Sequence, residues 1–250
     1  MMRMAAFARR NVCEILRDPL SYCFCLGFPV VMLLVFQIVN GSTGGMTPMF
    51  ELPQLTSGIS VFSFSFVMLY MALLVSGDRD SAFLTRLYCT PMTQADFALG
   101  YLLPGLAIAA GQAAVCLLCA WALGMATGDR ISLARGLLQI AALVPSMLMA
   151  VSFGVLFGSL LSSRSAPGVS SVLISASGFL SGAWMPLEQM GTYGKVCRVL
   201  PYYPAVRVGR AIMGGTWESG NWGDLVITAA WAALALGLAI ASQRRAMRVK

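Results

Sequence analysis

Long apolar stretches separated by short polar segments run along most of the 250-residue chain. A helix needs about 20 apolar residues to cross a hydrocarbon core of about 30 Å, and its backbone polar groups must be satisfied within the helix. Six stretches are long enough, and we predict a membrane span in each: residues 20–39, 57–76, 98–124, 137–161, 166–185 and 225–242. The expected fold is an all-α membrane protein in which residues 1–250 form a single transmembrane domain.

The composition supports this assignment. Hydrophobic residues make up 58% of the chain and charged residues 11%, with a mean hydropathy of +0.77. A soluble domain carries about 25% charged residues, so a water-soluble core cannot absorb this much apolar surface. The first stretch follows a leader of about 19 residues and is longer than the 7–15 apolar residues of a signal peptide, so we expect a retained span.

The first 18 residues have the pattern of an amphipathic helix. At 100° per residue, charged and apolar positions fall on opposite sides. The charged side holds Arg3, Arg10, Glu14 and Arg17, and the apolar side holds Met4, Ala8, Val12 and Ile15. We predict a helix that lies flat at the inner membrane interface and ends before Pro19. The alternative is a solvated tail whose pattern arises by chance.

Basic residues favour one orientation. The formal net charge is +7, and basic residues cluster near both termini (Arg3, Arg9, Arg10 and Arg17, then Arg244, Arg245, Arg248 and Lys250). An even number of spans puts both termini on one side, and the positive-inside rule assigns that side to the cytoplasm. Proposed inside segments then hold eleven Lys and Arg residues and outside segments six. This placement beside apolar spans argues against a nucleic-acid-binding protein.

Residues that could carry chemistry are scarce. The chain has no histidine, and its seven cysteines lie mostly in or beside apolar runs. Cys116 and Cys119 have the CxxC spacing but sit among Leu and Ala within a predicted span, so we interpret them as small buried hydrophobes. No GxxxxGK[ST] loop occurs, so ATP cannot be bound here in the usual way. We assign no catalytic, cofactor-binding or metal-binding residue.

Two segments between spans carry charge and proline without becoming ordinary polar loops. Residues 78–90 hold an acidic–basic cluster together with Phe83, Leu84 and Leu87 at helical spacing, which indicates a short docking helix that ends before Pro91 rather than a solvated loop. Residues 186–214 are predicted to form two short helices that dip through the outer leaflet. The signals for these two helices are Pro186, Glu188, Pro204 and the terminal Gly214–Gly215.

Charges at membrane depth are normally paired. We therefore hypothesise that Glu188 pairs with one of the three arginines of residues 186–214, namely Arg198, Arg207 or Arg210. The alternative is a plain external loop whose charges sit in water.

Small residues mark close helix packing. Gly154-x-x-x-Gly158 in the fourth stretch lets two helices approach closely, and the fifth stretch has small residues on one side: Ser171, Ser175, Gly178 and Gly182. The second stretch places serines between aromatic residues: Phe62, Ser63, Phe64, Ser65 and Phe66, with Tyr70 one turn further. Tight packing is the simplest interpretation of each.

Three segments of the chain carry a recognisable combination of charge, proline and apolar residues: "RNVCEILRDPLSYCFCLGFPVVMLLVF", "GDRDSAFLTRLYCTPMTQADFALGYLL" and "SGAWMPLEQM…VLPYYPAVRVGRAIMGG". They resemble ABC-2 type transporter permeases of the drug and natural-product export branch. Their order and spacing cover nearly the whole chain. The resemblance implies a six-helix half-transporter that pairs with a second copy or a related permease. It also implies two copies of a separate ATPase subunit, which would hold ATP and Mg²⁺.

The resemblance also assigns roles to residues. Residues 78–90 would be the coupling helix that meets the ATPase, with the contact residues Arg79, Asp80, Phe83, Leu84, Arg86 and Leu87. Ser81, Ala82 and Thr85 depart from the common pattern there. Spans two and five would flank the dimer interface and the substrate path, lined by Phe62, Phe66, Tyr70, Ser171, Ser175 and Phe179.

The expected function is export of an amphipathic small molecule, drug or peptide across a bacterial cytoplasmic membrane, as in multidrug efflux. Export of a lipid-linked glycan is the alternative within the same family. An ion-coupled carrier is disfavoured because the span cores lack acidic residues and no internal repeat is visible. An intramembrane enzyme is disfavoured because the chain has no histidine and no SxxK motif. A membrane-embedded scaffold remains open.

Overall fold

A computed structural model covers the chain and describes all residues except 1, 20–22, 43–47, 82–93, 130 and 249–250. Within the described part, every regular element is a helix. The α-helices are α1 (Met2–Arg17), α3 (Phe28–Ser42), α4 (Leu52–Asp80), α6 (Gln94–Thr127), α7 (Leu133–Ala142), α8 (Val144–Leu160), α9 (Ala166–Leu180), α10 (Gly191–Cys197), α11 (Tyr202–Gly214) and α12 (Gly220–Arg248). Short helical turns are η1 (Cys23–Gly27), η2 (Pro48–Phe50) and η3 (Leu187–Gln189).

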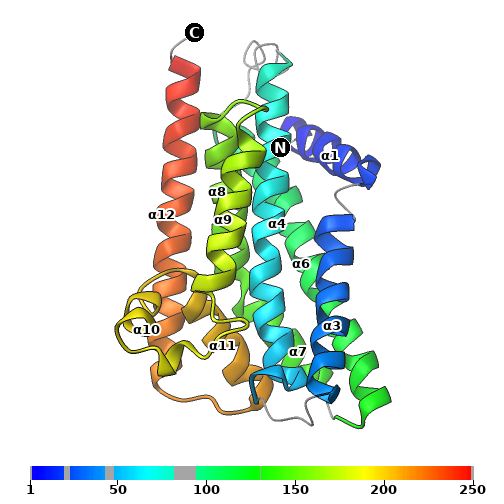
Figure 1. The fold of residues 1–250 in the computed structure, drawn as a ribbon. Coiled ribbons are helices and arrows are strands. Elements are labelled where there is room, and N and C mark those ends of the chain that lie inside the picture. Colours follow the sequence, from blue (N-terminus) through cyan, green and yellow to red (C-terminus); the bar gives the residue numbers. More distant parts are fainter. Residues whose placement is uncertain (1, 20–22, 43–47, 82–93, 130, 249–250) are drawn as a thin grey trace.

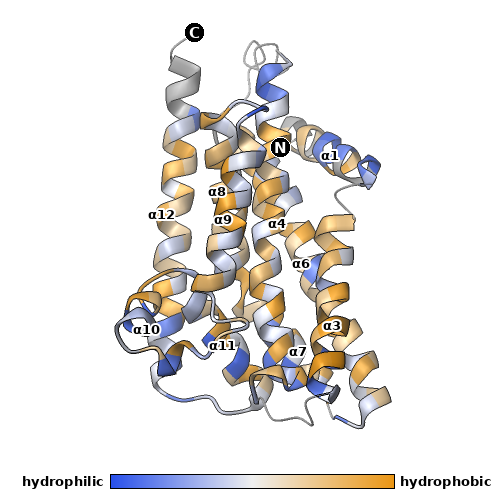
Figure 2. Ribbon diagram, viewed as in Figure 1, coloured by the Kyte–Doolittle hydropathy of each residue, from blue (hydrophilic) through white to orange (hydrophobic). Residues whose placement is uncertain are grey.

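The long helices form a bundle around α4 (Figure 1). Helix α4 packs against α8, α9, α11, α6 and α3, and 89% of its most apolar window is buried within the chain. Helix α12 packs against α8 and α11. Hydrophobic residues dominate along the bundle, while hydrophilic positions gather on α1 and around α10 and α11 (Figure 2). The chain therefore buries most of one apolar helix and leaves the outer apolar faces for lipid.

Among the described residues, four helices are long and apolar enough to cross a membrane: Cys23–Ser42, Leu52–Asp80, Asp96–Thr127 and Gly220–Gln243. They overlap the first, second, third and sixth predicted spans. The α7–α8 pair also passes as one span, so the described helices provide four or five candidate spans by length and composition. The six-span arrangement remains a prediction.

The fourth predicted span, residues 137–161, is broken rather than continuous. Helices α7 and α8 meet at Leu143 with a bend of 46°. Pro145 lies just after the bend, where its ring removes a backbone donor and clashes with the carbonyl four residues earlier. The uninterrupted apolar run concealed this break.

The fifth predicted span, residues 166–185, ends early. Helix α9 has 15 residues and stops at Leu180, which gives a length of about 22 Å. Gly182 follows with φ 65°, a left-handed conformation that glycine adopts without steric cost. The chain turns there into η3 and α10 instead of completing a span of about 30 Å.

Two glycines bring α8 against α4. A Cβ on Gly154 would lie 2.6 Å from the Met68 carbonyl oxygen, and one on Gly158 would lie 2.7 Å from that of Ala72. The Gly-x-x-x-Gly pattern thus marks a real contact between helices, as the sequence predicted.

Helix α1 lies across the same end of the bundle as the end of α12 (Figure 1). Its packed face is shifted from the predicted apolar face, of which Met4 and Ala8 are half-buried. Phe7 is buried against the rings of Phe97 and Tyr101, and the Asn11 amide donates to the Gly100 carbonyl at 2.9 Å. Val12 of the predicted apolar face is exposed. Gly100 explains the choice, because a Cβ there would stand 2.2 Å from the Phe7 ring.

Candidate functional site

Residues 186–214 form short helices at the end of the bundle opposite α1 (Figure 1). Pro186 precedes the single turn η3, α10 follows, and α11 begins after Pro201. Gly215 ends α11 with φ 71°, in the left-handed conformation that commonly terminates a helix. These elements hold the four charged residues that the sequence singled out.

Arg207 pairs with Asp224 on α12. Its Nη1 donates to Asp224 Oδ1 at 3.2 Å and lies 3.1 Å from Oδ2. The Asp224 side chain is 6% exposed and that of Arg207 is 29% exposed, so the pair is partly desolvated. The sequence did not predict this partner, because Asp224 stands just before the last predicted span and only the packing of α11 on α12 brings it to Arg207.

Arg210 instead binds backbone carbonyls. Its Nη2 donates to the Gly182 and Ala183 oxygens at 3.0 and 3.3 Å, and its Nε donates to the Gln54 oxygen at 3.4 Å. This side chain ties α11 to the turn after α9 and to the start of α4. Burial lowers the pKa of the Arg210 guanidinium from its ordinary value. The ordinary pKa of arginine is so far above neutral pH that the side chain stays protonated.

Glu188 forms no ion pair within 4.0 Å among the described residues, so the hypothesised direct pair with Arg198, Arg207 or Arg210 is wrong. Its Oε1 accepts a hydrogen bond from the Tyr203 hydroxyl at 3.3 Å. Arg198 is exposed. The pair does not form because Asp224 engages Arg207 while the backbone engages Arg210.

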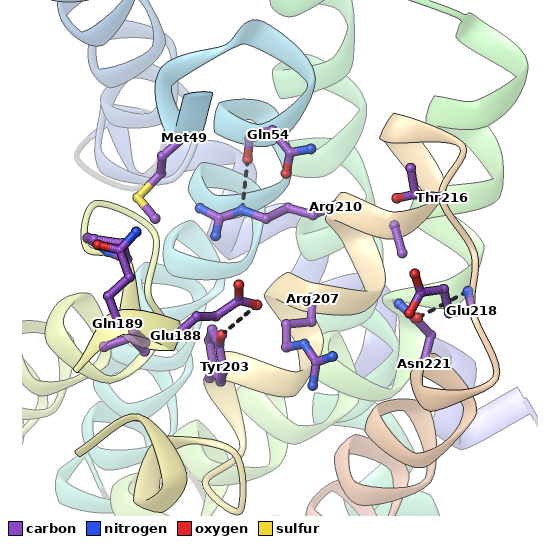
Figure 3. A pocket seen from close by; sticks show the side chains of 13 residues that line it. Met49, Gln54, Glu188, Gln189, Tyr203, Arg207, Arg210, Thr216, Glu218 and Asn221 are labelled. Carbon is purple, nitrogen blue, oxygen red and sulfur yellow. Dashed lines mark hydrogen bonds between the residues drawn. The ribbon is translucent and has the colours of Figure 1, made fainter. Parts of the chain in front are cut away.

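Glu188, Arg207 and Arg210 line a cavity of about 340 Å³, whereas Arg198 does not reach it (Figure 3). Its lining is rich in charged and amide groups: Gln54, Glu188, Gln189, Arg207, Arg210, Glu218 and Asn221, with Met49, Leu187 and Tyr203 among the less polar members. A second cavity of about 460 Å³ shares Met49, Gln54, Pro186, Gln189 and Arg210 with the first. The arrangement offers a polar binding site with charges of both signs.

The opposite end of the bundle holds a buried carboxylate. Asp78 is 3% exposed, and its oxygens accept from the Arg10 guanidinium and the Tyr101 hydroxyl, each at 2.8 Å. Glu14 lies 2.6 Å from the same guanidinium. Burial raises the pKa of Glu14 above its ordinary value. An acidic residue ending an apolar stretch, together with an arginine on an amphipathic helix, was the available signal for this contact.

Arg79 and Asp80 finish α4 and hold the loop between α8 and α9. The Arg79 guanidinium donates to the Ser159 and Leu161 carbonyls at 2.5 and 2.8 Å, where a cation is favoured by the helix dipole. Asp80 accepts from the Ser163 amide and hydroxyl at 2.9 and 2.6 Å. The predicted helix 78–90 thus begins inside α4. Its other contact residues, Phe83, Leu84, Arg86 and Leu87, lie outside the described residues.

The six residues predicted to line a substrate path are not brought together within this chain. Phe62, Phe66 and Tyr70 are buried, and the two phenylalanine rings pack with Phe28. Ser171, Ser175 and Phe179 are exposed on α9. The side of α9 that packs on α4 carries Ser177 instead, whose hydroxyl lies 2.8 Å from that of Ser65.

The described residues contain no group of three His, Cys, Asp or Glu side chains placed to hold a metal ion. The two ends of the bundle hold fixed charges, and the end at α11 also holds the polar cavity and its neighbour. These features suit the binding of a polar or charged ligand.

Two comparisons with known proteins bear on identity. A family model described as ABC-2 type transporter matches residues 3–213. No curated protein matches the chain. The match includes α1, the bundle helices through α9, and the short helices around the cavity.

Proposed function

The chain belongs to the ABC-2 type transporter family, and from this premise we propose that it is the transmembrane subunit of an ATP-driven exporter. The family is one of membrane transport domains, which accords with the apolar helices of this chain. We propose that the cargo is an amphipathic small molecule, drug or peptide. The observation that carries the proposal is the family match over residues 3–213 of a chain that has no GxxxxGK[ST] loop.

The absence of a GxxxxGK[ST] loop from this sequence supports separate ATPase subunits as partners. We propose that two copies of a separate subunit bind ATP and Mg²⁺ and that a second permease copy, or a related permease, completes the transporter. The exposed face of α9, with Ser171, Ser175 and Phe179, supports a route for cargo between two such subunits, because these side chains find no cover in a single chain. Both termini are proposed to face the cytoplasm of a bacterium, as the basic residues at both ends favour.

Residues 78–90 are proposed to contact the ATPase and to transmit its conformational change on ATP hydrolysis to the bundle. Two observations support this location. Arg79 and Asp80 attach the end of α4 to the α8–α9 loop, and α4 runs through the centre of the bundle to the cavity end. A displacement of this segment would therefore reach both α8 and the short helices through packed contacts.

The first experiment is purification of the chain from its native membrane in mild detergent, with mass spectrometry of bound proteins. The expected partner is a stoichiometric protein that carries a P-loop. ATP-dependent flux is then measured in liposomes, with Phe83→Ala and Arg86→Ala as contact variants and Lys195→Ala on α10 as the control. We expect the first two to lose flux and ATPase partner together, and the control to keep both.

A different outcome would redirect the assignment. If no ATPase is bound and no flux depends on ATP, the half-transporter proposal is wrong, and a scaffold or an ion-coupled carrier becomes the better hypothesis. If the partner is bound but the two contact variants act like the control, residues 78–90 are not the coupling segment.

A further inference from the structure

Charges in the cavity between α4, η3, α11 and α12 do not neutralise one another directly. Within the described part of the chain, Arg210 has no carboxylate within 4.0 Å, and Glu188 and Glu218 have no basic group within that distance. Arg207 is engaged by Asp224. The cavity thus has a cationic wall at Arg210 and carboxylates at Glu188 and Glu218 (Figure 3).

Arg210 is held in a fixed orientation toward this space. Three backbone carbonyls take hydrogen bonds from its Nε and Nη2, whereas its Nη1 has no hydrogen bond to the described residues. The same side chain lines both adjoining cavities. A guanidinium with free N–H groups, oriented in advance, is suited to a phosphate, which it can bind through two parallel hydrogen bonds.

The cavity lies close to a pair of tryptophans that indicate its level in the membrane. Trp217 and Trp222 contact edge to face with ring centroids 5.4 Å apart, and their exposed fractions are 38% and 60%. They flank Glu218 and Asn221 of the cavity lining in sequence. Exposed tryptophans of membrane proteins gather at the level of the lipid headgroups. The cavity is therefore placed where headgroups are found.

We propose that this cavity binds a zwitterionic headgroup that carries a phosphate and a primary ammonium, the chemistry of phosphoethanolamine. The phosphate lies against Arg210, and the ammonium donates hydrogen bonds to Glu188, which Figure 3 draws beside Tyr203 on the same side of Arg207 as the Arg210 guanidinium. A primary ammonium has three donors, whereas a trimethylammonium has none. A volume of about 340 Å³ is within the usual range for small-molecule sites. This inference goes beyond the proposed function and needs no ATPase to be tested.

The test uses the full chain purified in detergent and measures binding of short-chain phospholipids by native mass spectrometry and thermal shift. The probes share acyl chains and differ in headgroup: phosphatidylethanolamine, phosphatidylcholine and phosphatidylglycerol. We expect the ethanolamine lipid to bind about tenfold more tightly than the other two, since a hydrogen bond to a charged group contributes about that factor.

The variant Glu188→Gln removes the charge and keeps an oxygen that can accept from Tyr203. We expect it to reduce ethanolamine-lipid affinity about tenfold, to the level of the glycerol lipid. Asp129→Asn is the matched control, because Asp129 is an exposed carboxylate in the turn after α6 that lines neither cavity. It should leave all three affinities unchanged.

Free O-phosphoethanolamine distinguishes the two sources of this chemistry. If it competes with the lipid at matched concentrations, the site takes a soluble ligand; if only the lipid binds, the ligand comes from the membrane. Either result supports the headgroup chemistry. Equal affinity for the three lipids in the unaltered chain would overturn the proposal, and this comparison requires no variant to fold. An ethanolamine preference that survives Glu188→Gln would overturn it as well.

Discussion

The contact between α8 and α4 depends on two positions without a side chain, and Gly158→Ala tests it. A Cβ at residue 158 would lie 2.7 Å from the Ala72 carbonyl oxygen and 2.6 Å from the Val75 Cβ. Ordinary van der Waals contact requires 3.4–4 Å. The two helices must therefore separate locally by about 0.7 Å or more, which forfeits a quarter to a half of the dispersion energy of each affected contact.

The expected loss follows from two opposed terms. Overpacking of a tight interface costs about 1–3 kcal/mol, whereas alanine is favoured over glycine within a helix by about 0.5–1 kcal/mol. We expect Gly158→Ala to destabilise the chain by about 1–2 kcal/mol. The matched control is Gly237→Ala on α12, where a Cβ meets nothing within 4 Å, so only the gain of about 0.5–1 kcal/mol applies.

The assay is reversible unfolding of the purified chain in mixed micelles with increasing denaturing detergent, followed by circular dichroism. The two variants should shift the midpoint in opposite directions. Gly154→Ala should resemble Gly158→Ala, because its Cβ would lie 2.6 Å from the Met68 carbonyl oxygen. If Gly158→Ala is as stable as Gly237→Ala, then α8 does not approach α4 this closely and the packing argument is wrong.

Three further changes probe the two ends of the bundle. Asp224→Asn should destabilise the chain by about 2–3 kcal/mol, because it leaves the partly buried Arg207 without its counter-charge. A double-mutant cycle with Arg207→Gln should show coupling between the two positions, and additive losses would refute the pair. Tyr101→Phe removes a buried hydrogen bond to Asp78 and should cost about 1–2 kcal/mol in the same unfolding assay; an unchanged midpoint would argue against that bond. Phe7→Ala should release α1 from α6 and increase hydrogen exchange along residues 2–17 while leaving α4 protected, whereas unchanged exchange would show that α1 is held elsewhere.

Much of the architecture could be predicted from the apolar pattern because lipid leaves few options. A backbone in hydrocarbon must form helices, so long apolar runs identified Cys23–Ser42, α4, α6 and α12 to within several residues. Local signals also sufficed where the chemistry is local: Gly214–Gly215 ends α11 in a left-handed conformation, and Gly154 and Gly158 mark a close helix contact.

Only the tertiary structure decided how charges are paired and which faces are covered. Arg207 pairs with Asp224 rather than with Glu188, and Arg210 donates to backbone carbonyls. These partners are set by how α11 packs against α12, α4 and the turn after α9. Phe62 and Phe179 share an aromatic character, yet one is buried and the other exposed. Apolar periodicity within one helix shows which face can contact lipid or protein. Whether lipid or protein covers that face depends on neighbouring helices that are distant in sequence.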